Sequence, residues 1–388
     1  MRGHVQRKDK NWYVVLEMDR EDGERKQKWI SVRKELGLAK RATRPQADTL
    51  LIKKLGELQE GSYFEPAEMT VGEFLNKWME DYARANLKTK TVEFYGNLIT
   101  CHIIPELGKI ELSKLRPSHI QGLLSQKLKG SRADDKEGGL SKRSVRYIYV
   151  TLHLALKHAV EWELASKNAA EKVKPPKVDK PKIQYWAKQE TQKFLNATKG
   201  HRLYALYLLA LTTGMRKGEI LGLTWDNINF KKQTVKITQT LISTNDGDRI
   251  QDTAKTQGSE RTLTISPAVA LELSHHHTRQ KEEFMLLGRP EKDLGLVFTS
   301  NAGTPLITRN LNRNFNCLIK KAKVRKIPFH SLRHTYATLM LSEYGEDIVT
   351  LSKRLGHSNV TTTLNTYGHV IPQKQKEAAA RTDDLIAK

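Results

Sequence analysis

Most of the chain carries apolar residues at the three- and four-residue spacing that is typical of amphipathic helices. The N-terminal part differs, because residues 12–17 and 26–32 alternate in polarity like strands. Asp22-Gly23 between them is a hairpin-turn signal. A helical pattern follows at 44–58. Residues 1–62 are therefore predicted to form a small sheet with one helix.

A second segment, residues 69–171, has helical periodicity only. Thr70 is a candidate N-cap with a glutamate three residues further on, which is the pattern of a capping box. Ser141 is a second candidate N-cap, before a long amphipathic stretch. The apolar positions of that stretch are Val145, Ile148, Leu152, Leu156 and Ala159. Helices are also expected at 90–100 and from the residue after Pro117 to Leu128, so the segment is predicted to be all-helical.

Residues 172–182, KVKPPKVDKPK, form the strongest internal boundary, since their prolines favour an extended basic linker. In the third segment, 183–388, residues 234–240 and 261–266 alternate like strands, and helices surround them. The predicted fold class is multidomain. It comprises a small α+β N-terminal domain, an all-α domain, and a mixed, mainly-α domain with a small antiparallel sheet.

The charge of the chain favours a polyanionic partner. Its 388 residues include 66 Lys and Arg against 43 Asp and Glu, a net charge of +23. Such a field attracts nucleic acid, the commonest soluble polyanion. Four basic positions in the stretch after Ser141 suit either contact with phosphates or a solvated helix face. They are Lys142, Arg143, Arg146 and Lys157.

A location in the cytosol is expected. No apolar run approaches the roughly 18 residues of a membrane span, and neither a secretory signal nor a lipidation motif stands out. Cys101 and Cys317 are the only cysteines and lie far apart, so a disulfide framework is not expected.

Neither a metal nor another cofactor is expected. The chain has no GxxxxGK[ST] phosphate loop and no HExxH metal motif. His275-His276-His277 is interpreted as a solvated stretch rather than a metal site. Metal-free phosphodiester chemistry instead needs cations for the non-bridging oxygens, an acid for the leaving oxygen, and a nucleophile.

Two motifs supply the first cations. In TTGMRKGEILGLTW, Arg216 opens a helix and Glu219 lies three residues later on the same face, where it can fix the guanidinium. In AKTQGSERTL, Lys255 precedes the strand that begins at Arg261, where it can protonate a leaving 5′ oxygen. Taken singly, these residues also suit an ordinary ion pair and an exposed loop lysine.

Two further motifs follow near the C-terminus. In PFHSLRHTYAT, His330 and Arg333 share a helix face. The guanidinium group of Arg333 can bind, with two hydrogen bonds, the same phosphate that Arg216 binds. The adjacent His334 is expected to point elsewhere, in a supporting or structural role. In LGHSNVTTTLNTYGHV, Tyr367 lies ten positions after His357 and offers a phenolic nucleophile. In isolation, most such tyrosines are packing residues.

In this order and spacing, the set resembles the catalytic residues of the tyrosine recombinases, especially phage and integrative-element integrases of Gram-positive type. The resemblance covers the third segment throughout and is strongest in HSLRHT and LGHSNVTTTLNTYGHV. It implies that residues 1–62 are an arm-type DNA-binding domain with a three-stranded sheet and a helix. Residues 69–171 would then be a helical core-binding domain, and 183–388 the catalytic domain.

The resemblance also implies a role for each residue. Arg216 and Arg333 would clamp the scissile phosphate, and Lys255 would protonate the 5′-hydroxyl. His330 would assist proton transfer at the tyrosine. His357 would donate a hydrogen bond to a non-bridging oxygen of the phosphate. Tyr367 would attack phosphorus and form a 3′-phosphotyrosyl link.

The implied function is site-specific recombination that integrates or excises a mobile element, of phage or transposon type. The implied partners are double-stranded DNA with core and arm sites, and three further copies of the chain in a tetramer that passes through a Holliday junction. An excisionase-type directionality factor and a host DNA-bending protein are family expectations. The tail at 373–387 is expected to dock on a neighbouring subunit. The reaction would take place on DNA in the bacterial cytosol.

Three alternatives remain open. A type IB topoisomerase uses similar chemistry, but segment 1–62 and the chain length favour an integrase. A recombinase of the Xer type would usually lack segment 1–62. A non-catalytic DNA-binding regulator would lack a catalytic residue, and none of the six is missing.

Overall fold

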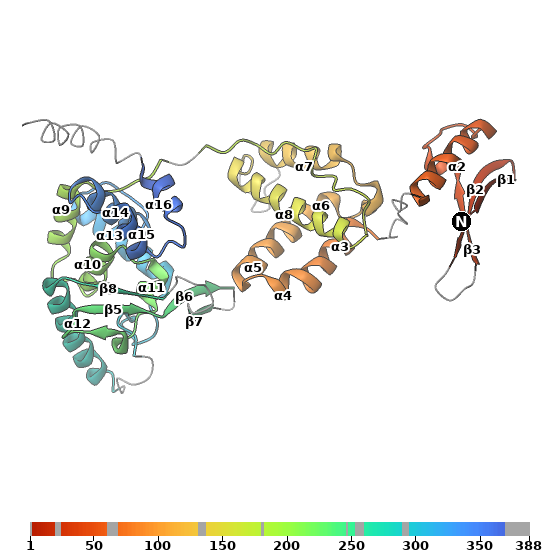
Figure 1. Cartoon of the computed structure of the whole chain (residues 1–388). Helices are drawn as coiled ribbons and strands as arrows, with labels where there is room; N and C mark the ends of the chain where they lie inside the picture. The colour runs from red at the N-terminus through yellow and green to blue at the C-terminus, as the bar shows by residue number, and fades with distance from the viewer. Residues whose placement is uncertain are drawn as a thin grey trace, which may run out of the picture. The chain divides into compact units, whose positions relative to one another are not determined.

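The computed structural model divides the chain into two compact units, Met1–Val178 and Asp179–Lys388 (Figure 1). The division lies within the predicted linker. None of the described helices is both long and apolar enough to cross a membrane. The residues that the structure describes are 2–19, 25–59, 69–130, 137–179, 182–245, 247–252, 260–288 and 295–368.

The first unit begins with an antiparallel sheet of order β1-β2-β3, formed by Arg2–Lys8, Asn11–Asp19 and Arg25–Ser31. Helices α1 (Val32–Glu35) and α2 (Arg44–Gln59) follow. The predicted sheet with one long helix is confirmed, although polarity alternation had not indicated β1. The predicted turn at 22–23 lies outside the described residues. The buried apolar side chains that cluster in the core of this part are Val14, Leu16, Val32, Ala42, Ala47 and Leu50.

The rest of the first unit is helical, as predicted. Two helices continue through π-helical turns, η1 and η2, and the second of them extends beyond the end predicted at residue 100. The elements are α3 (Val71–Trp78), η1 (Met79–Ala83), α4 (Arg84–Asn86), α5 (Thr89–Leu98), η2 (Ile99–Ile103), α6 (Ile104–Leu107), η3 (Leu112–Lys114), α7 (Pro117–Lys129) and α8 (Lys142–Glu161).

Both predicted N-caps of this part are present. Thr70 Oγ1 accepts a hydrogen bond from the Glu73 backbone N–H (3.2 Å), and Glu73 Oε2 accepts one from the Thr70 N–H (2.7 Å). Ser141 Oγ accepts a hydrogen bond from the Ser144 N–H (3.1 Å). These bonds satisfy amide groups that the first helical turn leaves without a partner.

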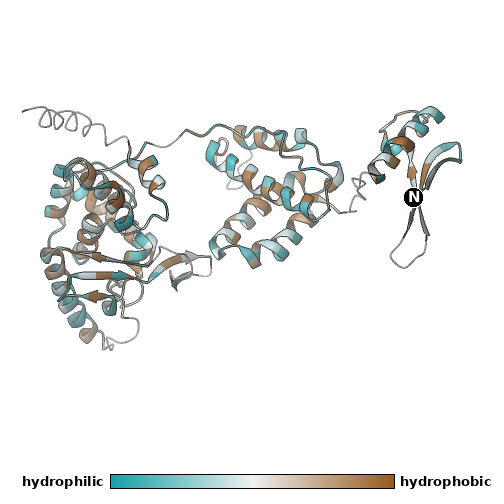
Figure 2. Cartoon of the chain, in the orientation of Figure 1, coloured by the Kyte–Doolittle hydropathy of each residue, from teal (hydrophilic) through white to brown (hydrophobic). Residues whose placement is uncertain are grey.

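The core of the helical part forms around α8 and Trp78. All five predicted apolar positions of α8 are buried. Trp78 is fully buried and its Nε1–H donates a hydrogen bond to His158 Nδ1 (2.7 Å). In Figure 2 the helices show hydrophobic and hydrophilic residues in alternating patches, as expected for helices with one buried face.

The second unit contains eight α-helices in its described residues. They are α9 (Lys188–Thr198), α10 (Tyr204–Thr213), α11 (Lys217–Leu221), α12 (Pro267–Leu286), α13 (Thr308–Ala322), α14 (Ser331–Ser342), α15 (Ile348–Leu355) and α16 (Val360–Tyr367). Helix α10 is buried along most of its length and packs against α9, α12 and α14. It therefore forms the centre of this unit.

A three-stranded antiparallel sheet of order β4-β5-β8 joins these helices, and β6 pairs with β7 in a separate hairpin. The predicted strand at 234–240 was wrong in extent, because the chain leaves the first sheet at Thr238 and enters the hairpin. The predicted strand at 261–266 ends at Thr264, since Ser266 caps α12. The strands are β4 (Ile228–Asn229), β5 (Thr234–Ile237), β6 (Gln239–Thr244), β7 (Gly247–Asp252) and β8 (Arg261–Thr264).

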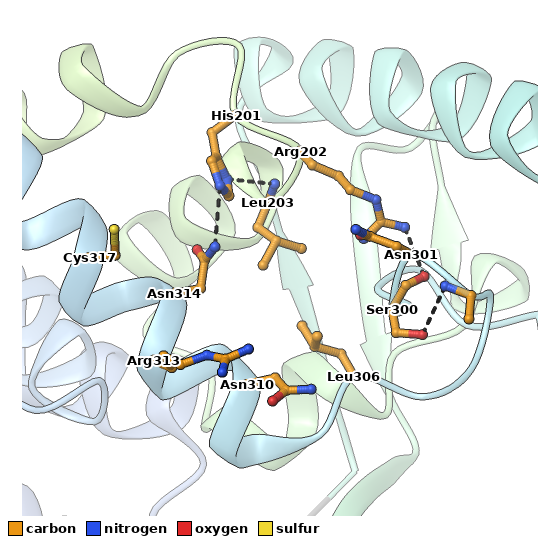
Figure 3. Close-up of a pocket in the computed structure, with 11 residues that line it drawn as sticks. His201, Arg202, Leu203, Ser300, Asn301, Leu306, Asn310, Arg313, Asn314 and Cys317 are labelled. Carbon is orange, nitrogen blue, oxygen red and sulfur yellow. Dashed lines mark hydrogen bonds between the residues drawn. The ribbon is translucent and has the colours of Figure 1, made fainter.

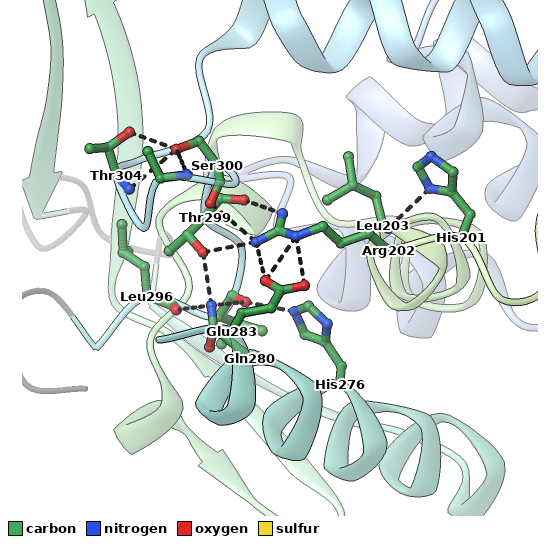
Figure 4. Close-up of polar contacts among 12 residues, drawn as sticks. His201, Arg202, Leu203, His276, Gln280, Glu283, Leu296, Thr299, Ser300 and Thr304 are labelled. Atoms are coloured by element: carbon green, nitrogen blue, oxygen red, sulfur yellow. Dashed lines mark hydrogen bonds and ion pairs between the residues drawn. The ribbon is translucent and has the colours of Figure 1, made fainter. Parts of the chain in front are cut away.

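A polar network attaches α12 to the segment at 296–300 (Figure 4). Arg202 donates hydrogen bonds to the Glu283 carboxylate (2.8–3.1 Å) and to the Thr299 backbone O (2.7 Å). His276 Nε2 bonds the Val297 backbone O (2.8 Å) and is buried. The interpretation of 275–277 as a solvated stretch was therefore wrong for His276, because its face of α12 turns inward.

We predict that Thr70→Ala destabilises the start of α3 by about 1 kcal/mol, because the Glu73 amide loses its acceptor. Hydrogen exchange of the peptide covering residues 70–80 should become faster. Thr89→Ala is the matched control, since Thr89 is exposed at the first position of α5, one residue after the N-cap position. Equal exchange in the two variants would contradict the capping role.

Candidate active site

The turn between α10 and α11 presents Arg216. Gly214 ends α10 in the left-handed region (φ 66°), and a Cβ at this position would lie 2.5 Å from the Tyr336 ring. Glu219 accepts hydrogen bonds from the Arg216 backbone N–H (2.8 Å) and from Nη1 (2.9 Å). The predicted pair is thus made, and the Arg216 side chain remains 41% exposed. An external anion can reach it.

Arg333 lies in the first turn of α14 and is only 3% exposed. It donates hydrogen bonds to the backbone O of Gly214 (2.9 Å) and of Leu355 (2.8 Å), and Nη2 lies 2.8 Å from His357 Nε2. Burial and the neighbouring Arg216 lower the pKa of Arg333 to about 10. The guanidinium therefore remains charged at neutral pH.

His357 has a defined tautomer in this arrangement. Arg333 only donates hydrogen bonds, so His357 Nε2 accepts one, and its Nδ1–H donates to Thr363 Oγ1 (2.7 Å). Burial and Arg333 lower the pKa of His357 to about 4. The imidazole is therefore neutral, and the structure brings it together with Arg333.

Tyr367 is the last residue of α16 and is 1% exposed. Its Oη lies 2.8 Å from His334 Nδ1. Burial raises the pKa of Tyr367 to about 12, against an opposing effect of Arg333. Burial, with His330 and Arg333, lowers the pKa of His334 to about 4. The neutral phenol therefore donates its proton toward a neutral imidazole.

The expectation that His334 points away from the site was therefore wrong. Helices α14, α15 and α16 share a small apolar cluster, and this packing brings Tyr367 to the face of α14 that carries His334. His330 precedes α14 as its N-cap. In the described residues it contacts the His334 ring edge-on, at a centroid distance of 5.1 Å, rather than Tyr367.

Arg261 is a member of the site that the motifs did not identify. Its Nη1 and Nη2 donate to the two carboxylate oxygens of Glu219 (3.1 and 2.8 Å), and its Nε donates to the Arg354 backbone O (2.8 Å). The alternation of side chains along a strand could have predicted its orientation, because Arg261 and Leu263 lie on the same, inward face of β8. An arginine on an inward face requires an acidic partner.

The C-terminus of α15 is the point where these arginines meet. Three consecutive backbone carbonyls accept from three different arginines: Arg354 O from Arg261, Leu355 O from Arg333, and Gly356 O from Arg216 (2.9 Å). The last carbonyls of a helix have no partner within it, and they carry partial negative charge. The helix end therefore holds the cations in one place.

The other predicted site residues, Lys255 and the four basic positions of α8, are not among the residues gathered at the end of α15. Lys255 lies outside the described residues, in the connection between β7 and β8. In the first unit, the four basic candidates are all exposed on α8, where Lys157 pairs with Glu161 (3.4 Å). In the part of the chain that the structure describes, no three side chains of His, Cys, Asp or Glu gather as a metal site would need.

A cavity of about 780 Å³ lies beside α13, and Asn310 and Arg313 are among the residues that line it (Figure 3). Leu203 on its wall precedes α10, whereas Gly214 and the arginines lie at the other end of that helix. Ten helical residues span about 15 Å. This cavity is therefore separate from the candidate active site, and none of the predicted catalytic residues lines it.

Comparison with known proteins places the chain in a family. Residues 184–374 match the model of the phage integrase family, and residues 70–128 match the phage integrase N-terminal SAM-like domain. A XerC-like tyrosine recombinase of Caldanaerobacter subterraneus is 30% identical over 89% of this chain and 90% of its own length. The ICEBs1 integrase of Bacillus subtilis is 30% identical over 69% of this chain and 73% of its own.

Solved structures agree in fold. The Tn1549 transposon integrase in complex with transposon right end DNA superimposes with a TM-score of 0.67 at 22% identity, covering 82% of this chain and all of that chain. A lambda integrase dimer bound to a core site gives a TM-score of 0.53 at 20% identity, over 77% of this chain and 95% of that chain. The chain belongs to the phage integrase family and is a tyrosine recombinase.

Proposed function

We propose that Tyr367 is the nucleophile with which this recombinase cuts and rejoins DNA at the ends of a mobile element. The observation that carries the proposal is the convergence of Arg216 and Arg333 on the end of α15, with Tyr367 at the end of the following helix. A phosphate held by the two guanidinium groups would lie beside the helices that carry the phenol. The family membership and the DNA-bound solved relatives support DNA as the partner.

In the proposed reaction, Tyr367 Oη forms a bond to phosphorus while the bond from phosphorus to the 5′ oxygen breaks. The leaving oxygen takes a proton from Lys255, and the phenolic proton passes to a base. The 3′-phosphotyrosyl ester keeps the bond energy, so the reverse attack by a 5′-hydroxyl rejoins the strand without ATP. Two guanidinium groups stabilise the charge that develops on the phosphorane oxygens.

His334, rather than His330, the residue that the family pattern implies, would take the phenolic proton while the phenol still contacts it, before Tyr367 moves toward the phosphate. His334 Nδ1 contacts the phenolic oxygen and is neutral, as a proton acceptor must be, whereas His330 contacts the His334 ring. The role proposed for His357 is a hydrogen bond to a non-bridging oxygen. Its Nε2 faces Arg333, so this bond requires Nε2 to gain a proton when the phosphate arrives.

Attack also requires Tyr367 to become accessible, because its side chain is 1% exposed. We infer that α16 shifts when DNA binds. The apolar cluster that holds α16 is small, which limits the cost of the movement.

The wider assembly is proposed on the same basis. Residues 1–62 would bind arm sites, residues 69–171 would bind core sites through exposed basic positions of α8, and four protomers would act together on DNA in the bacterial cytosol. A directionality factor and a host DNA-bending protein would regulate the assembly. The proposed docking segment, 373–387, lies outside the described residues.

The central prediction concerns the covalent intermediate. Wild type should form a detergent-stable adduct with DNA from either side of its own gene, with EDTA present, because arginines provide the positive charge. Tyr367→Phe should bind the same DNA and form no adduct. Tyr344→Phe is the matched control, since Tyr344 is 61% exposed and lies in no motif. Sequencing the attached fragment would identify the attachment site.

Each outcome separates the candidate functions. Adduct in the Tyr367→Phe variant would place the nucleophile elsewhere. Tight DNA binding without any adduct would favour a non-catalytic regulator. Adduct accompanied by supercoil relaxation, but without exchange of strands between two sites, would favour a topoisomerase.

A second prediction concerns residues 1–62. A chain lacking them should still form the adduct on core-site DNA, but its affinity for DNA that carries the flanking repeats should fall to that for core DNA alone. Footprinting of both chains on the same fragment measures this difference. Unchanged protection of the flanking repeats would reject the arm-binding role.

A third prediction concerns acid. The folded pKa of His334 is about 4, below its ordinary 6.5, so between these values the unfolded chain binds a proton that the folded chain does not. The contribution of neutral His334 to the free energy of unfolding should therefore be complete above about pH 6.5. It should be lost as the pH drops toward about 4. His334→Gln should make this fall shallower. Urea unfolding at several pH values checks it, and an unchanged slope would contradict a buried, neutral His334.

A further inference from the structure

Arg261 lies beside the clamp and directs its guanidinium at protein groups. Its side chain is 8% exposed, and all three of its guanidinium nitrogens donate to Glu219 or to the Arg354 carbonyl. A Cβ at Gly356 would lie 2.6 Å from Arg261 Nη1, so the turn that leads to His357 packs directly on this guanidinium. The residue therefore acts on its neighbours, not on a phosphate.

Glu219 connects Arg261 to the clamp. Its carboxylate is 6% exposed and lies between two guanidinium groups, those of Arg216 and Arg261. Burial by itself raises the pKa of Glu219, but the hydrogen bonds and charges of Arg261 and then of Arg216 outweigh it and hold the pKa below its usual range. Arg261 provides two of the hydrogen bonds that the carboxylate accepts, so much of its charge is balanced without Arg216.

The consequence for Arg216 is electrostatic. A buried carboxylate with a single cationic partner draws that partner into a closed pair, because an unpaired buried charge is costly. With Arg261 in place, Arg216 donates Nη1 to Glu219 and Nη2 to the Gly356 carbonyl, and its side chain stays 41% exposed. Without Arg261, Glu219 would compete with the DNA phosphate for the same guanidinium.

We propose that Arg261 is a positioning residue for strand cleavage, which holds Glu219 so that Arg216 presents its guanidinium to the scissile phosphate. The inference rests on the proposed function and adds to it a group that never touches DNA.

Arg261 also begins β8, after the connection in which Lys255 lies, and its bond to the Arg354 carbonyl fixes the start of that strand.

The test compares single-turnover adduct formation with DNA affinity. Arg261→Lys keeps the charge but cannot bridge both carboxylate oxygens and the carbonyl, so the cleavage rate should fall about 10- to 100-fold. The dissociation constant for core DNA should change less than about threefold, because Arg261 is covered. Arg279→Lys is the matched control, since Arg279 pairs with Glu272 on α12 (3.0 Å) and should cleave like wild type.

A double-mutant cycle distinguishes positioning from general destabilisation. If Arg261 acts through Arg216, then Arg261→Lys should cost less than about threefold in a chain that already carries Arg216→Lys. A purely structural role would instead lower the rate by the same factor in both backgrounds, and that additive result would overturn the inference. If Arg261→Lys does not fold, Glu219→Gln takes its place in the cycle, with the same expectation.

Failure of the inference can be told apart from failure of the proposed function. If wild type forms an adduct that depends on Tyr367 and Arg261→Lys forms it at the same rate, only the positioning role is refuted. If wild type forms no adduct on the attachment-site DNA, the proposed function fails, and this inference with it.

Discussion

The candidate active site depends on the unpaired carbonyls at the end of α15. A helix leaves its last carbonyl groups without partners, and here three consecutive ones bind three arginines that come from β8, α14 and the start of α11. Gly356 ends α15 in the left-handed region (φ 68°), which turns the chain toward His357 and α16. One helix terminus therefore sets the positions of the cations, of a histidine and of the tyrosine-bearing helix.

This arrangement gathers more positive than negative charge. Three arginines, Arg216, Arg261 and Arg333, lie near one buried carboxylate, that of Glu219, which accepts hydrogen bonds from the first two. The carbonyl dipoles reduce the repulsion among the arginines without neutralising it. Burial, and after it the charge of Arg216, lowers the pKa of Arg333. An incoming phosphate would supply the missing anion. Burial is the main reason why His357 and His334 remain neutral, and the neighbouring positive charges add to it by lowering their pKa values further.

Patterns within one element could be predicted from the sequence, whereas pairings between distant elements could not. The stripe of α8 and the cap at Thr70 follow from local periodicity and hydrogen bonding, so they were predicted correctly. Strand β1 was missed because the turn after it uses Asp9 and Lys10 at positive φ, without the glycine that signals such turns. Arg261 and His334 acquire their partners through packing between β8, α11, α14 and α16, which no spacing in the chain reveals.

If Tyr367 is the nucleophile, its buried position links the chemistry to the binding of DNA. A phenol with a pKa of about 12, buried against a neutral histidine, is a poor nucleophile. The phosphate that Arg216 and Arg333 are proposed to hold would arrive from the exposed side of Arg216, so the phenol would have to leave its apolar site to reach it. Outside that site, burial no longer raises its pKa while the guanidinium groups still lower it. Exposure and activation of Tyr367 would then be the same event, which restricts strand cleavage to a chain that already holds its substrate.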